Sequence, residues 1–72
     1  MEKKKLYAIK RITWDQKAEY FDFCMLEWVS EANFDNFCLS NKDLAEHYAK
    51  QAGIEELVTF DISFTETGKE VI

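Results

Sequence analysis

The chain has 72 residues, of which 47% are hydrophobic and 15% aromatic, and its formal net charge at pH 7 is −5. Its length predicts one domain, its apolar content excludes a disordered chain, and its acidity argues against binding a nucleic-acid backbone through clustered lysines and arginines. No apolar run reaches the roughly 18 residues of a membrane span. We therefore expect a single domain over residues 1–72, in the cytoplasm and without membrane contact.

The N-terminal segment predicts a strand over residues 5–14. Its sequence, "KLYAIKRITW", is rich in β-branched and aromatic residues, which favour a pleated surface. Leu6, Ala8, Ile12 and Trp14 share one face of such a strand. The lysines that precede it, Lys3 to Lys5, are typical of an edge strand protected from aggregation.

The next segment, "AEYFDFCMLEWV" at 18–29, gives two conflicting signals. Its apolar residues recur with the period of a helix, which predicts a helix over 15–31. Its residue types, above all "YFDF", favour a strand, because aromatic rings lose rotamer freedom in a helix. We predict a strand over 18–26 and keep the helix as the alternative.

The second half of the chain gives clearer signals. After a turn-rich stretch with a short strand at 36–39, Ser40 is placed to cap a helix over 41–52, which Gly53 ends. "ELVTFDISFTE" then alternates and predicts a strand over 57–65. Residues 66–69 are predicted to form a turn, and the last three residues a short strand or a tail.

These elements predict an α+β fold. We expect a small two-layer sandwich, in which an antiparallel sheet of three or four strands (5–14, 18–26, 36–39 and 57–65) carries the 41–52 helix on one face. The alternative, with residues 15–31 helical, gives two helices on a smaller sheet.

The sequence contains no group of residues typical of a catalytic, metal-binding or cofactor-binding site. His47, the single histidine, falls on the polar face of the predicted helix, and Cys24 and Cys38 match no metal motif. The two glycines stand apart, so there is no phosphate-binding loop. We expect no enzyme activity, no cofactor, no metal and no small-molecule ligand. The cysteines are expected to be reduced, with a disulfide between them left open.

Two resemblances suggest alternatives. "FTETGKEVI" at the end of the chain resembles the closing wing strand of winged-helix proteins, which implies a nucleic-acid-binding regulator. In the 41–52 helix, however, Asp43 and Glu46 offset the basic residues that such a protein needs. The lysine-led first strand and the aromatic second segment are similar to many short proteins of phages and mobile elements. Together with the acidic charge, this similarity implies an inhibitor of a basic host protein.

The number of aromatic rings predicts an interface. A sheet with one covered face cannot bury them all, and aromatic residues are enriched in the centres of interfaces. We therefore expect a non-enzymatic protein-interaction module that self-associates as a homodimer or binds another protein. The candidate interface residues come from the aromatic second segment and its surroundings: Tyr20, Phe21, Phe23, Trp28 and Phe34.

Overall fold

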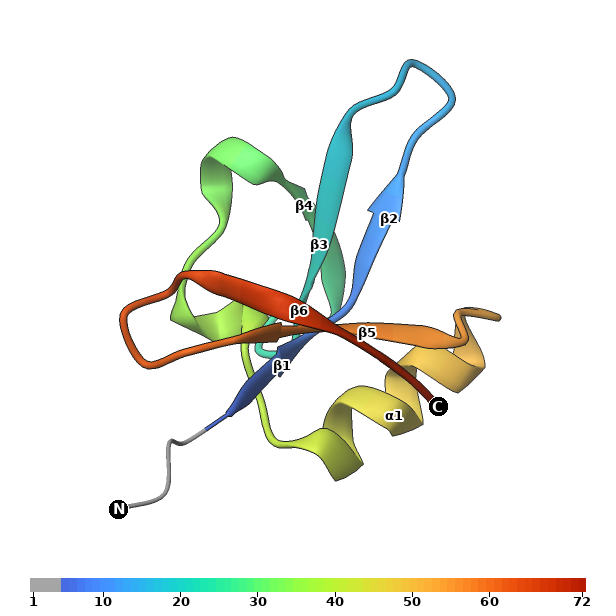
Figure 1. Ribbon diagram of the computed structural model, residues 1–72. Helices are drawn as coiled ribbons and strands as arrows, with labels where there is room; N and C mark the ends of the chain where they lie inside the picture. The colour runs from blue at the N-terminus through green and yellow to red at the C-terminus, as the bar shows by residue number, and fades with distance from the viewer. Residues whose placement is uncertain (1–4) are drawn as a thin grey trace.

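The computed structural model describes residues 5–72, so the prediction for Lys3 and Lys4 lies outside the described part. The described chain forms short strands, two 3₁₀ turns and one α-helix (Figure 1). In chain order these are β1 (Leu6–Ala8), β2 (Lys10–Ile12), β3 (Ala18–Asp22), β4 (Glu27–Ser30), η1 (Glu31–Asn33), η2 (Asn36–Cys38), α1 (Lys42–Gln51), β5 (Glu56–Phe60) and β6 (Glu66–Val71).

Two three-stranded antiparallel sheets make up the fold, which confirms the α+β class. Their strand orders are β1-β5-β6 and β2-β3-β4. Strands β1 and β2 are separated only by Ile9, so one bent segment passes from the first sheet into the second. The predicted 5–14 strand is therefore interrupted at its centre and ends at Ile12, and the predicted single sheet is two sheets that diverge.

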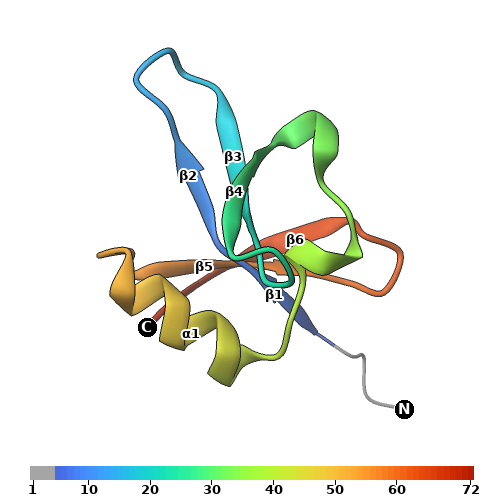
Figure 2. The ribbon, with the colours of Figure 1, turned by 180° about the vertical axis from the view of Figure 1, so that it is seen from behind.

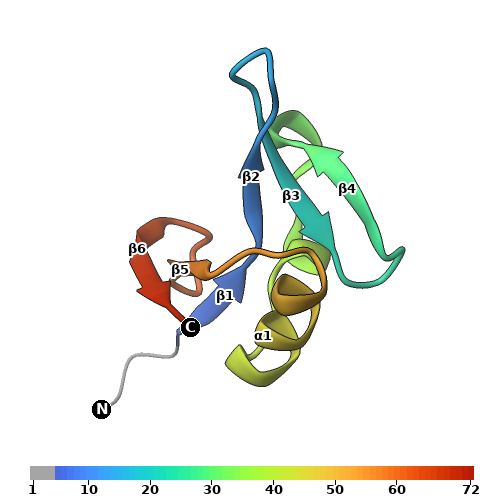
Figure 3. The same ribbon diagram turned by 90° about the vertical axis from the view of Figure 1, so that its right-hand side faces the viewer.

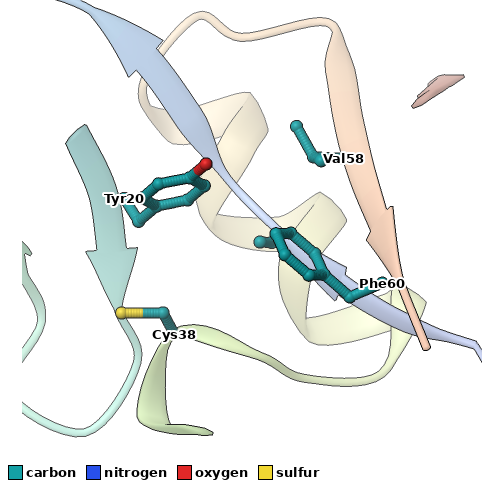
Figure 4. Packing of buried hydrophobic residues seen from close by; sticks show 5 residues of the cluster. Tyr20, Cys38, Val58 and Phe60 are labelled. Carbon is teal, nitrogen blue, oxygen red and sulfur yellow. The ribbon is translucent and has the colours of Figure 1, made fainter. Parts of the chain in front are cut away.

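The alternation of side chains along the bent segment divides the core in two. Ala8 packs with Tyr20, Cys38, Val58 and Phe60 in a cluster between the two sheets, as Figure 4 shows for the labelled residues. The neighbouring residue Ile9 points to the other face.

On that other face, Ile9 and Leu57 pack against the helix. They meet Ala45 and Ala49 of α1, and the exposed fraction of all four residues is 0%. The two alanines have no side chain beyond Cβ, so the helix axis lies close to the sheets. Views from opposite sides show α1 below the divergence of the strands (Figures 1 and 2).

Helix α1 lies where the sequence predicts it, but it begins differently. Asn41, and not Ser40, is its N-cap, and the Asn41 side chain accepts a hydrogen bond of 2.9 Å from the Leu44 backbone N–H. At the other end, Gly53 has φ +73°, the left-handed conformation that was expected to end the helix.

The alternative helix over 15–31 is wrong, because this segment forms a hairpin. Strands β3 and β4 pair with Phe21 opposite Trp28, and the reversal between them is a tight turn. The Asp22 carboxylate accepts hydrogen bonds from the backbone N–H groups of Cys24 and Met25, at 2.8 and 2.9 Å. This turn ends the strand earlier than the predicted 18–26. It is followed by β4, which was not predicted from the sequence.

Three other boundaries are corrected. Residues 36–38 form a 3₁₀ turn and not a strand, because the Asp35 side chain caps the Phe37 N–H at 3.0 Å. Strand β5 ends at Phe60, where Asp61 accepts from the N–H groups of Ser63 and Thr65 and turns the chain. Residues 66–69, predicted as a turn, and the residues after them, predicted as a short strand or a tail, then pair with β5 as β6, which ends at Val71.

The final hairpin and the helix together test the resemblance to winged-helix proteins. "FTETGKEVI" ends in β6, which pairs with β5 much as a wing would. A winged helix also needs a recognition helix within a helix-turn-helix unit. Residues 5–72 contain α1 as their one α-helix, and this helix packs on the sheets without a second helix beside it. The fold is therefore not that of a winged helix.

None of the helical residues described makes a segment long and apolar enough to cross a bilayer.

Candidate interaction surface

The five residues predicted for the interface lie on two different faces of the molecule. Tyr20 is only 5% exposed and belongs to the cluster between the sheets. Its ring centre lies 4.7 Å from that of Phe34 and 6.3 Å from that of Phe60. Phe34 is half-buried and stacks on Phe60 at 5.0 Å. These two predicted residues thus serve the core more than the surface.

Phe21, Phe23 and Trp28 lie together on the opposite face. The ring of Phe21 is 5.5 Å from both Phe23 and Trp28 and 5.3 Å from Tyr48 of α1. The three residues are half-buried, and the Arg11 guanidinium covers Trp28 from outside at 4.1 Å from the ring centre. This row therefore joins helix α1 to the β3–β4 hairpin and presents only part of its surface to solvent.

A more exposed apolar surface adjoins the Phe23 end of this row. Its large side chains come from three segments: the β3–β4 turn, η2 and the first turn of α1. The exposed fractions are 66% for Met25, 55% for Leu26, 51% for Phe37 and 39% for Leu44. We call these four residues, with the half-buried Phe23 and Tyr48, the helix-side patch.

A backbone hydrogen bond and a contact between two aromatic rings hold the three segments of the helix-side patch together. The Phe23 N–H donates to the Phe37 carbonyl at 2.9 Å, which fixes the turn against η2. The Phe23 and Tyr48 ring centres lie 6.1 Å apart, which joins the turn to the helix. Leu44 precedes Tyr48 by one helical turn and so extends the same face of α1. In Figure 2 the β3–β4 turn lies directly above α1.

Leu26 has a left-handed backbone conformation, which Gln16 and Phe64 share in the other two hairpin turns. Its φ is +56°, in the left-handed region where a residue with a Cβ costs about 1–2 kcal/mol. Glycine or asparagine would adopt this conformation more readily. The chain instead places there a leucine that is more than half exposed, so the side chain gains little from burial.

Acidic side chains surround the helix-side patch. Glu27 follows Leu26, Asp35 precedes η2, and Asp43 precedes Leu44; all three residues are exposed. His47 lies beside the patch, with its ring 5.0 Å from Tyr48 and its Nε2 atom 3.0 Å from the Gln51 amide. Exposed acidic residues thus adjoin the apolar residues of the patch along the chain.

Phe23 was predicted from the sequence as an interface residue, but the other members of the helix-side patch were not. "CML" and Phe37 were assigned to strands, in which half of the side chains face the core. A signal was present in "FDFCML", since Asp22 is a residue that caps turns and the apolar residues after it would then be exposed.

One cluster in the described residues has the donors for a metal ion. Oxygen and sulfur atoms of Asp22, Asp35 and Cys38 lie within 4.8 Å of one another. Both carboxylates already accept backbone N–H groups in the adjoining turns. Burial raises the pKa of the Cys38 thiol and so disfavours the thiolate that would bind a metal. The cluster therefore fits a structural role in closing the two turns.

Both cysteines are free thiols, with Cys24 exposed and Cys38 buried. Comparisons of the chain with protein-family models, with curated proteins and with solved structures found no match.

Proposed function

We propose that this chain is a non-enzymatic protein-interaction module and that the helix-side patch is its docking surface. The observation that carries this proposal is the exposure of Met25, Leu26, Phe37 and Leu44 on three segments that the contacts of Phe23 with Phe37 and Tyr48 join. Soluble monomers seldom expose several large apolar side chains side by side, and such patches commonly mark interaction sites.

The energetics support a binding role. Complete burial of a leucine, methionine or phenylalanine side chain is worth about 1.5–3 kcal/mol. The fold leaves much of this free energy unused at four neighbouring positions, and it also holds Leu26 in an unfavourable conformation. A partner that covers the patch would recover the free energy that folding leaves unused.

The charges indicate the chemistry of the partner. The module carries a net charge of −5, and Glu27, Asp35 and Asp43 stand at the margin of the helix-side patch. Complementary charges around an interface raise association rates and select partners. The partner is therefore a protein with an apolar face flanked by lysines or arginines. A basic host protein blocked by a phage-type inhibitor is one member of this class.

A non-catalytic role agrees with the use of the polar groups. Asp22 and Asp35 cap turns, and His47 contacts Gln51 and Tyr48 on its own helix. The side chains of Asp22, Asp35 and His47 are thus engaged in contacts within the fold.

The test compares three baits in affinity capture from cells that express the chain: the wild-type protein, Phe37→Asp and the matched control Ile62→Asp. Ile62 is 72% exposed but lies on the β5–β6 turn, away from the helix-side patch. A protein recovered with the wild type and the control but not with Phe37→Asp is then purified. The proposal requires that it bind 1:1 in calorimetry and more weakly at high salt. Equal recovery of every protein on all three baits would contradict the proposal.

A further inference from the structure

The β2–β3 hairpin projects from the body of the molecule and ends in an exposed tryptophan. Figures 1, 2 and 3 all show this arm pointing away from α1 and the other sheet. Trp14 at its tip is 94% exposed, and Ile12 below it is 56% exposed. An isolated domain gains nothing from a tryptophan in this position, whereas tryptophan is enriched among the residues that dominate binding energy at interfaces.

Among the strands of residues 5–72, none covers the second edge of β2. In its sheet the order is β2-β3-β4, so β3 covers one side only. The Ile9 carbonyl accepts from the Phe21 N–H, and the Thr13 N–H donates to the Lys17 carbonyl, so odd-numbered residues direct their backbone groups toward β3. The backbone groups of Lys10 and Ile12 therefore point to the open edge.

This open edge lines a cavity. Where β2 diverges from β5, a cavity of about 430 Å³ is bordered by Lys10, Ile12, Ile54, Val58 and Val71, together with Glu55, Glu56 and Lys69. We call this cavity the fork. Val71 is 76% exposed, so the fork, like the arm, presents apolar surface to solvent.

We propose that two copies of this chain form a symmetric dimer, in which the β2 edges pair antiparallel and each Trp14 enters the fork of the other copy. The arm and the fork belong to the same chain, with the fork at the root of the arm. Two arms laid antiparallel bring each tip to the other root, which is the self-complementarity that a two-fold interface needs. The two sheets join as β4-β3-β2 with β2-β3-β4 of the second copy.

The positions of the open backbone groups select the register. If Ile12 lies opposite Ile12 of the second copy, then Lys10 lies opposite Trp14, and all the paired positions are on the open edge. If the centre moves to Arg11, Trp14 faces Ala8, which is already paired with Val58 of β5. The first register therefore leaves the pairing of β1 with β5 intact. It brings Trp14 close to Lys10, whose ammonium group lies 3.8 Å from Glu66 and 5.8 Å from the Tyr20 ring centre within its own copy.

The charged groups of the two elements are paired largely within each copy. On the arm, Lys10 lies 3.8 Å from Glu66 and Arg11 lies 2.7 Å from Glu19. The fork is lined by Glu55 and Glu56 and by Lys10 and Lys69, and Glu56 is 3.7 Å from Lys69. The dimer uses a surface other than the helix-side patch, so the dimer and the proposed function can fail independently.

The first test is the concentration dependence of the mass by sedimentation velocity. The wild type is expected to reach about twice its 8.5 kDa mass at high micromolar concentration. Trp14→Ala is expected to raise the dimer dissociation constant at least tenfold. Met25→Ala removes another exposed apolar side chain, from the helix-side patch, and is expected to leave that constant unchanged. A wild type that stays monomeric, or a dimer insensitive to Trp14→Ala, would overturn the dimer.

The second test fixes the register by cross-linking. Directly opposite residues in a hydrogen-bonded antiparallel pair have Cα atoms about 5.5 Å apart, within the range of about 4.4–6.8 Å that a disulfide spans. In a Cys24→Ser background, Ile12→Cys is therefore expected to form a covalent dimer on mild oxidation. Ile62→Cys, at a more exposed position on the β5–β6 turn, is expected not to do so. Absence of the Ile12→Cys cross-link, or equal cross-linking of both variants, would overturn the register centred on Ile12.

Discussion

The hydroxyl of Tyr7 on β1 donates a hydrogen bond of 3.0 Å to the Oε2 atom of Glu70 on β6, across the intervening strand β5. The same carboxylate lies 3.1 Å from the Lys5 ammonium and 3.3 Å from the Lys42 ammonium at the start of α1. Glu70 thus connects both outer strands of its sheet and the beginning of the helix.

Glu70 predicts a pH dependence of stability. The hydrogen bond from Lys5, followed by that from Tyr7, lowers the pKa of Glu70 below its ordinary value of 4.5. Because the folded pKa is the lower one, the stabilisation is fully present above pH 4.5 and is lost as the pH falls through the folded pKa. Glu70→Gln is expected to lower the melting temperature at pH 7 and to weaken its fall between pH 5 and pH 3. Glu55→Gln is the control, and equal acid profiles for both variants would contradict this role.

Asp22 predicts a loss of stability at the β3–β4 turn. Its side chain is buried, with the residue 7% exposed, and it accepts two backbone N–H groups that would otherwise lose their partner. Asp22→Ala is expected to lower the free energy of unfolding by about 2 kcal/mol in urea denaturation. Asp22→Asn keeps one acceptor oxygen and should lose less. If the two variants were equally stable, the hydrogen bonds would not be the cause.

At Leu26 we expect a substitution that stabilises the fold to weaken binding of the partner. Leu26→Gly relieves the positive φ and is expected to raise the free energy of unfolding by about 0.5–1 kcal/mol, while weakening capture of the partner. Met25 is not among the residues with positive φ, so Met25→Gly should give no such gain. A Leu26→Gly variant less stable than the wild type would show that the leucine side chain serves folding.

The two thiols predict a difference in reactivity. Cys24 is exposed, whereas burial raises the pKa of Cys38 and excludes reagent. Alkylation with iodoacetamide at pH 8, followed by mass spectrometry, is expected to add one group quickly at Cys24. Cys38 should react only as fast as the chain opens, and sub-denaturing urea should accelerate this second step. Equal rates at both sites in the folded protein would contradict the burial of Cys38.

The sequence predicted the parts of the fold whose signals are local. Helix α1 has an apolar stripe, a polar N-cap region and a terminal glycine, and the α+β class follows from it and the alternating strands. The division of residues 5–14 at Ile9 could not be predicted, because the bend depends on two different partners, β5 and β3. The first part of strand β6 was predicted as a turn because its sequence is polar, as expected of an edge strand with little burial.

The candidate interface was predicted less well, for a physical reason. Aromatic content identified the right region but could not separate rings that fill the core from those on the surface. Tyr20 is buried because β3 places it between the sheets, while Trp14 is exposed because the hairpin extends beyond them. Exposure of this kind depends on where the sheets diverge, and no local pattern in the sequence encodes that point.

The proposed function is tested most directly by comparing the amount of purified partner that binds to the wild-type protein and to Phe37→Asp, with Ile62→Asp as control. The helix-side patch predicts saturable 1:1 binding to the wild type and the control, and at least tenfold weaker binding to Phe37→Asp. Equal affinity of all three proteins for the partner would contradict the assignment of this surface.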